Sequence, residues 1–143
     1  YFKNLNSLDK TEHRQNIIKS DYGHSIIDNS FNSNPMAIEY SLETLSELGT
    51  KNSKRYLITP GLIELGSDQF SINYAFATEA SIIVDQALVV GYTNKRSLIA
   101  GFEENNTPVN WFINRDEAVA FLNSIVESDD IVLFENDLPD HYP

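Results

Sequence analysis

The sequence predicts an α/β domain, a three-layer sandwich in which a mostly parallel sheet of about six strands carries helices on both faces. Two observations predict this fold. Short runs of β-branched and aromatic residues alternate with longer segments whose apolar residues recur every three or four positions. This alternation is typical of a Rossmann-like parallel sheet, because parallel strands need crossover connections and helices supply them. The 143 residues suit one domain, 1–143, with a sizeable core.

Five short apolar segments are expected to be buried strands. Each is rich in β-branched or aromatic residues and is bounded by polar or turn residues. They are residues 24–28, 55–59, 86–90, 110–113 and 131–134. Residues 15–19 are expected to add a further strand at the edge of the sheet.

The first helix is expected between Asn34, which can cap it, and Gly49, which can end it in a left-handed conformation. Pro35 suits its first helical position. Its apolar stripe is predicted to consist of Ile38, Leu42 and Leu45. Three acids at every fourth position are predicted to lie on the wet face, namely Glu39, Glu43 and Glu47.

Three more helices are expected, over residues 67–81, 94–104 and 115–127. In the first of them Phe70, Tyr74 and Ala77 have the spacing of an apolar stripe. The last begins after Asn114, a good capping residue. Its inward residues are predicted to be Ala118, Leu122 and Ile125.

Composition excludes several classes of protein. Ten cations against 21 acids give a net charge of −11, which disfavours nucleic-acid binding because such a surface repels phosphates. The absence of cysteine excludes disulfides and thiolate metal sites, and it fits a cytoplasmic protein. No apolar run of about 18 residues is present, so no membrane span is expected.

The loops that follow the strands are where a ligand is expected, because open parallel sheets bind ligands beyond the carboxyl ends of their strands. The first such loop, residues 28–35, crowds short polar side chains in front of a helix N-terminus. These side chains can cap the helix, and the free backbone N–H groups can also hold an anion. The residues alone leave both interpretations open.

Two further loops carry unusual residues. Residues 59–66 contain a Pro-Gly turn and then Glu64 between apolar neighbours, and residues 135–142 contain three acids and His141. The last loop offers too few ligands for magnesium, calcium or zinc. The sequence also has no phosphate-binding loop, dinucleotide fingerprint or nucleophile elbow. No catalytic residue and no metal site are therefore expected in this domain.

Several short motifs follow one another in a specific order. His13-Arg14 precedes, by about a dozen residues, an Ile-Ile-Asp strand end and then Asn-Ser-Asn-Pro at a helix start. Glu-Leu-Gly follows at 64–66 and Val-Val-Gly at 89–91. This order resembles the C-terminal domain of the Mur ligases, especially the UDP-N-acetylmuramoyl-tripeptide–D-alanyl-D-alanine ligase branch. The resemblance implies one domain of a three-domain enzyme, with residues 1–9 as a cut edge.

The resemblance implies an ATP-dependent ligase. Such enzymes use ATP and magnesium to convert a carboxylate into an acyl phosphate, which an amine then attacks. The N-terminal and central domains of the same protein are the expected partners, and the central domain binds most of the ATP and Mg. The isolated domain is expected to be inactive. The implied ATP-binding residues are Arg14 at the phosphates, and Asp28 and Asn29 near the ribose.

The resemblance also implies a small-molecule amine acceptor, an amino acid or a dipeptide. The amide would join it to a UDP-MurNAc-peptide-like carboxylate in bacterial peptidoglycan synthesis. The implied acceptor-binding residues are Asn32, Ser33, Asn34, Leu62, Glu64, Asp137, Asp140 and His141.

The chain departs from the family pattern at three places. Asn29 stands where the family has a second acid, and Ile72-Asn73 stands where the family often has a histidine, early in the helix after Glu-Leu-Gly. Residues 134–140 replace a basic Lys-Gly-Ser-Arg end of the last strand. Other acceptors, including polyglutamate-type substrates, stay open. So does a non-enzymatic binding module that shares the fold. A phospho-acceptor signalling domain using Asp28 is disfavoured, because no lysine follows Lys95.

Overall fold

The computed structural model describes residues 16–29 and 35–136, and the order of its elements is the expected one. The strands are β1 (Asn16–Lys19), β2 (Ser25–Asn29), β3 (Arg55–Thr59), β4 (Gln86–Val90), β5 (Val109–Phe112) and β6 (Ile131–Glu135). The helices are α2 (Pro35–Glu47), α3 (Gln69–Ser81), α4 (Lys95–Glu104) and α5 (Arg115–Ile125), with a short 3-10 turn η1 (Gly66–Asp68) before α3.

One six-stranded sheet has the order β1-β2-β6-β3-β4-β5. Strand β1 pairs antiparallel with β2 at the edge, and every other pair is parallel. The predicted α/β sandwich with a mostly parallel sheet is therefore confirmed. Strand β6, the last in the chain, lies between β2 and β3. The carboxyl ends of these three strands consequently meet at one edge of the sheet.

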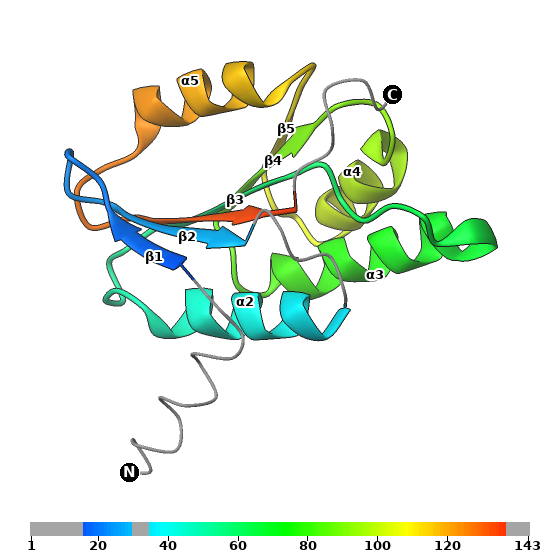
Figure 1. The fold of residues 1–143 in the computed structure, drawn as a ribbon, viewed down its shortest axis with the longest axis horizontal. Helices are drawn as coiled ribbons and strands as arrows, with labels where there is room; N and C mark the ends of the chain where they lie inside the picture. The colour runs from blue at the N-terminus through cyan, green and yellow to red at the C-terminus, as the bar shows by residue number, and fades with distance from the viewer. Residues whose placement is uncertain (1–15, 30–34, 137–143) are drawn as a thin grey trace, which may run out of the picture.

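The described helices cover both faces of the sheet: α2, α3 and α4 pack on one face and α5 packs on the other (Figure 1). The chain runs from β2 through β3 and β4 to β5 in one direction, and right-handed crossovers place α2, α3 and α4 together. The return from β5 to β6 runs the other way, so α5 packs on the opposite face. The core between the sheet and the three helices includes Ile27, Leu45, Leu57, Leu98, Phe102 and Leu133.

The predicted bounds of β3 and β4 are confirmed. In α2 the predicted apolar stripe is buried, and its three acids are exposed. The longest described helices, α2 and α3, have 13 residues each. No helix in the described part of the chain is long and apolar enough to cross a membrane.

The predicted inner face of α3 is wrong at its start. Phe70 is 51% exposed, and the buried residues of the helix are Asn73, Phe76, Ala77 and Ala80. Helix α5 ends at Ile125, two residues earlier than predicted. The buried Asp130 accepts hydrogen bonds from the backbone N–H groups of Glu127 (2.8 Å) and Lys54 (2.9 Å). These bonds fix a turn between α5 and β6 in place of further helix.

Candidate functional site at the carboxyl edge of the sheet

A buried carboxyl group lies at the carboxyl edge of the sheet, at the end of β6. Glu135 is 0% exposed, and Asn29 Nδ2 donates to both its carboxyl oxygens at 3.0 Å. Asn29 Nδ2 also donates to Ser41 Oγ on α2 at 2.5 Å. We call Asn29, Ser41 and Glu135 the Glu135 cluster. It joins β2, β6 and α2 at one point.

Burial raises the pKa of Glu135 to about 8, and the hydrogen bonds with Asn29 and Ser41 oppose this rise only in part. The carboxyl group is therefore mainly neutral at pH 7. The backbone beside it is also fixed, because Thr59 Oγ1 of β3 donates to the Glu135 carbonyl oxygen at 2.6 Å. A buried polar network with every member bonded in this way holds the strand ends rigidly.

Three amide side chains, two from α3 and one from the residue just before α4, form a second cluster, which we call the amide cluster: Gln69, Asn73 and Asn94. Asn94 Oδ1 accepts from Gln69 Nε2 at 2.7 Å and from Asn73 Nδ2 at 3.1 Å. Asn94 Nδ2 donates to the carbonyl oxygens of Pro60 and Leu62, both at 2.9 Å. Asn94 makes no side-chain cap on α4, because its side chain is turned back toward this loop.

The loop after β3 is held between the two clusters. Its Leu62 N–H donates to Asn73 Oδ1 at 2.8 Å, and Asn136 Nδ2 donates to the Gly61 carbonyl oxygen at 2.7 Å. Gly61 has φ of +85°, and a Cβ there would lie 2.6 Å from Asn73 Oδ1. Position 61 therefore favours glycine, which has no Cβ and adopts a positive φ without strain. The hydrogen bonds of the loop fix it relative to α3 and α4.

A groove runs beside this loop, between the start of α3 and the length of α4. It consists of two adjoining hollows of about 250 and 340 Å³, which share Phe70 and Arg96. The first is also lined by Tyr92, Thr93, Asn94 and Ser97. Thr93 Oγ1 is buried and has no hydrogen-bond partner among the residues that the structure describes. The second is also lined by Lys95, Ile99, Ala100 and Glu103. The groove therefore combines aromatic surface, two cations, one acid and a buried polar atom.

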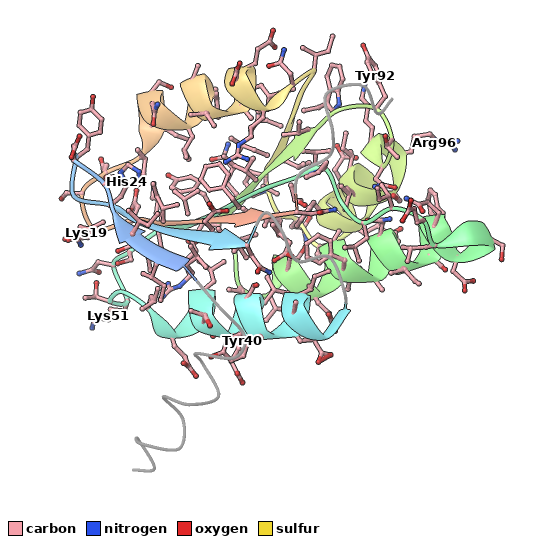
Figure 2. All side chains as sticks on the ribbon, in the orientation of Figure 1. Lys19, His24, Tyr40, Lys51, Tyr92 and Arg96 are labelled. Carbon is pink, nitrogen blue, oxygen red and sulfur yellow. The ribbon has the colours of Figure 1, made fainter. Side chains whose placement is uncertain are left out.

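Arg96 is the exposed cation of this groove. Within the described chain no hydrogen bond or ion pair holds its guanidinium group. Figure 2 shows Tyr92 and Arg96 near α4, at the opposite end of the molecule from Lys19, His24 and Lys51. A guanidinium group beside a helix N-terminus whose cap is turned away favours an anionic group, such as a carboxylate.

The neighbouring cation, Lys95, is held by aromatic rings. Its Nζ lies 3.9 Å from the centroid of the Trp111 ring and 5.9 Å from that of Tyr92. Trp111 is fixed in turn, since its Nε1 donates to the Gly91 carbonyl oxygen at 2.6 Å. The Tyr92 ring packs against Trp111 with ring centroids 5.0 Å apart, so these contacts orient the side of the groove that follows β4.

Four of the predicted site residues lie in the described chain. Asp28 and Asn29 end β2, where Asp28 is half-buried and Asn29 is 1% exposed. Leu62 is buried and anchors the loop after β3, while Glu64 is exposed with φ of +64°. The others lie outside the described residues, namely Arg14, Asn32, Ser33, Asn34, Asp137, Asp140 and His141. The nucleotide and acceptor roles of all these residues stay predictions.

Sequence reasoning did not select three residues that the structure brings to this edge: Glu135, Asn94 and Arg96. One signal was present for Glu135, which directly follows four buried apolar strand residues. For Asn94 and Arg96 the signal is weaker, a polar Asn-Lys-Arg segment after a strand. In the described residues no group of three or more histidine, aspartate or glutamate side chains could hold a metal ion.

Comparison with protein-family models matches residues 13–135 to the family described as Mur ligase, glutamate ligase domain. A search of curated protein sequences gives no match. The matched range covers most of the chain, including both clusters and the groove.

Solved structures of similar fold come from the same group of enzymes. MurF from Acinetobacter baumannii has a TM-score of 0.71 at 20% identity, over 87% of this chain and 27% of that one. MurF from Thermotoga maritima in complex with ADP has a TM-score of 0.64 at 20% identity, with the same shares. Murein peptide ligase from Psychrobacter arcticus has a TM-score of 0.62 at 15% identity, with 87% and 27% covered. This chain therefore has the same fold as the matched part of these structures, and it spans about a quarter of their length.

Proposed function

This chain belongs to the family of Mur ligase, glutamate ligase domains, and from that premise we propose that it is the C-terminal domain of an ATP-dependent ligase of peptidoglycan precursor synthesis. The family match over residues 13–135 carries this proposal. The reaction would join the carboxylate of a UDP-MurNAc-peptide-like substrate to an amine in the bacterial cytoplasm. The rest of the ligase, beyond the quarter that this chain represents, would hold most of the ATP and Mg.

The nucleotide is proposed to meet this domain at the end of β2. Asp28 and Asn29 would lie near the ribose, and Arg14 would reach the phosphates. A guanidinium group stabilises the charge that develops when the terminal phosphoryl group is transferred to the carboxylate. Closing the domain would also exclude water from an acyl phosphate that water would hydrolyse. No step is assigned to a metal ion in this domain.

The acceptor is proposed to lie across the carboxyl edge, with its carboxylate at Arg96 and its amine toward the acidic residues. The groove supports the first half, because it offers Arg96 and the uncapped start of α4 to an anion. The acids that the resemblance assigns to the acceptor, Glu64, Asp137 and Asp140, would attract its ammonium group. An amino acid or a dipeptide carries both a carboxylate and an amine.

Arg96→Ala is expected to raise the KM for the acceptor in the intact ligase about 10- to 100-fold, because a charge-assisted hydrogen bond contributes about 1.5–3 kcal/mol. The acceptor is first found by screening amino acids and dipeptides for stimulation of ATP hydrolysis. Lys51→Ala is the control, since Lys51 is an exposed cation at the other end of the molecule (Figure 2). An unchanged KM for Arg96→Ala would exclude the groove as the carboxylate site.

Arg14→Ala is expected to lower the turnover of the intact ligase about 10- to 100-fold, since it removes a cation from the transferred phosphoryl group. Turnover should fall far more than the free energy of unfolding, because the role proposed for Arg14 is contact with the phosphates. Lys10→Ala is the matched control. Turnover equal to that of the unmodified enzyme would show that the phosphate role is wrongly assigned.

The alternative function, a non-enzymatic binding module, makes a different prediction about the parent gene. A ligase requires a phosphate-binding loop encoded upstream of this domain, because the described residues contain none. A parent protein with such a loop and with amine-stimulated ATP hydrolysis would support the ligase. An unrelated upstream domain would support the binding module.

A further inference from the structure

Gln69, the first residue of α3, joins the loop that follows β3 to the loop that follows β4. Its Nε2 donates to the Leu62 carbonyl oxygen at 2.5 Å and to Asn94 Oδ1 at 2.7 Å. Its Oε1 accepts from the Leu65 N–H at 3.2 Å. One side chain therefore holds the loop after β3 against the residue that precedes α4.

These hydrogen bonds fix the orientation of the Gln69 amide group. The amide nitrogen has two hydrogen atoms, and each is directed at an oxygen atom, while the amide oxygen faces an N–H group. Asn94 cannot turn its own amide, because its Nδ2 donates to the carbonyl oxygens of Pro60 and Leu62. Gln69 also lines the first hollow of the groove, but it has no N–H left to donate to a ligand there.

On the loop side, the Gln69 bridge holds Glu64 in an unfavourable backbone conformation. Glu64 has φ of +64°, in the left-handed region that residues other than glycine rarely adopt. Gln69 binds Leu62 before it in the chain and Leu65 after it. The hydrogen bonds on either side of Glu64 offset the cost of this conformation and maintain it. Because Glu64 is exposed, the loop presents its carboxylate to solvent from a fixed backbone.

On the other side, the bridge fixes the first turn of α4. The Asn94 carbonyl oxygen accepts from Ser97 Oγ at 3.2 Å and from the Leu98 N–H at 3.0 Å. Arg96 lies within this turn, two residues after Asn94. The hydrogen bond from Gln69 to Asn94 therefore ties the backbone that carries Arg96 to the backbone that carries Glu64.

We propose that Gln69 is a positioning residue that sets the separation between Glu64 and Arg96, and thereby the length of the acceptor that the ligase uses. This inference rests on the proposed function, which places the carboxylate of the acceptor at Arg96 and its amine toward Glu64 and the other acids. The amine and the carboxylate of an amino acid lie closer together than those of a dipeptide. A site with a fixed separation of charges therefore favours one of these two classes.

The first measurement is steady-state kinetics of Gln69→Met in the intact ligase, a change that removes the amide without adding charge. The substrates are the amino acid and the dipeptide that most stimulate ATP hydrolysis in the acceptor screen. The KM for the better of the two should rise about tenfold, the usual effect of one lost hydrogen bond, and the KM for ATP should stay within about twofold. Discrimination between the two, the ratio of their kcat/KM values, should fall about tenfold.

The matched control is Gln86→Met, which makes the same chemical change at the opposite end of β4 from the groove. The Gln86 amide donates to Asn110 Oδ1 at 2.6 Å, so this variant also loses a hydrogen bond between side chains. It should discriminate between the two acceptors as the unmodified enzyme does. An equal fall in discrimination for both variants, or an equal rise of the KM for ATP and for the acceptor in Gln69→Met, would overturn the proposal.

The second measurement is a double-mutant cycle of Gln69→Met with Arg96→Ala. If Gln69 acts by setting the separation of the two charged groups, it has little to set once Arg96 is removed. Gln69→Met should then change discrimination by less than about twofold in the Arg96→Ala background. Effects of the two substitutions that multiply in full would show that Gln69 acts independently of Arg96, and the proposal would fail.

The role of Gln69 and the proposed function fail in different ways. Unchanged discrimination in Gln69→Met, in a ligase whose ATP hydrolysis an amine stimulates, would overturn the role of Gln69 and leave the ligase function intact. No stimulation by any amine in the unmodified ligase would overturn the proposed function, and the selection of an acceptor with it. The bridge itself is tested by hydrogen exchange in the 143-residue chain, where the Leu65 amide should exchange about tenfold faster in Gln69→Met. An unchanged rate would show that Gln69 does not hold the loop.

Discussion

Glu135→Gln is expected to remove most of the pH dependence of the protein's stability between about pH 5 and about pH 8. The Glu135 carboxyl group has an ordinary pKa of 4.5, and burial raises this pKa to about 8 in the folded protein. Between these two values the folded state holds a proton that the unfolded state has lost. The free energy of unfolding therefore falls as pH rises through this window. Glutamine cannot ionise, so the free energy of unfolding of the variant does not fall for this reason.

The expected fall in the free energy of unfolding is large for a single residue. At about 1.4 kcal/mol per pKa unit, the gap between 4.5 and about 8 corresponds to about 5 kcal/mol. Urea unfolding of both proteins at several pH values measures it. Burial lowers the pKa of His24, which makes both proteins more stable as pH rises toward 6.5, so the difference between their curves is the relevant quantity. Parallel curves would contradict a buried neutral carboxyl group.

The Glu135 cluster brings together two of the three departures that the resemblance to the Mur ligases implies. In that expected pattern an acid stands at the position of Asn29, and a basic strand end stands in place of the segment that contains Glu135. The structure places these two residues in contact, 3.0 Å apart. An aspartate at position 29 would put two carboxyl groups against each other in a buried site, which is costly. The residues at positions 29 and 135 therefore depend on each other, because the Asn29 amide donates to the Glu135 carboxyl group.

Sequence periodicity correctly predicted the strands and helices whose buried side chains are apolar. The bounds of β3 follow from a run of apolar residues that polar residues flank. The apolar residues Tyr56, Leu57 and Ile58 are all buried. The wet face of α2 follows from its three regularly spaced acids, which are all exposed. In these elements the local pattern and the tertiary packing agree.

Periodicity failed where a polar side chain is buried for its hydrogen bonds. Asn73 is 0% exposed on the inner face of α3, because its amide completes the bonds of Leu62. A hydrophobic pattern assigns such a residue to the surface and turns the helix toward Phe70 instead. The partner of Asn73 lies 11 residues earlier, in a loop whose path the sequence does not reveal.

The sequence predicted that the candidate site lies at the carboxyl edge of the sheet, but it did not predict which side chains meet there. Ligand-binding loops after strands were expected, and the parallel topology places them together. The Glu135 cluster was not expected, because Asn29 and Glu135 are 106 residues apart and become neighbours only when β6 inserts beside β2. That insertion depends on the whole sheet order and not on any local motif.

Gly61→Ala is expected to destabilise the protein by about 3 kcal/mol. About 1–2 kcal/mol is the cost of a left-handed conformation for alanine, and Gly61 has φ of +85°. The rest comes from overpacking, since the new Cβ would lie 2.6 Å from Asn73 Oδ1 and 2.7 Å from Asn94 Nδ2. Urea unfolding of the chain at constant pH measures the change.

Gly91→Ala separates these two causes, because Gly91 has a similar φ of +81° and a Cβ there meets nothing within 4 Å. It should cost only the conformational part, about 1–2 kcal/mol. Equal losses for both variants would show that the amide cluster yields to a methyl group. A larger loss for Gly61→Ala would show that the methyl group strains the amide cluster, and this strain is expected to shift Asn94 at the start of α4 and Arg96 with it. The KM for the acceptor should then rise in Gly61→Ala and stay near normal in Gly91→Ala, which ties the rigidity of this loop to the groove.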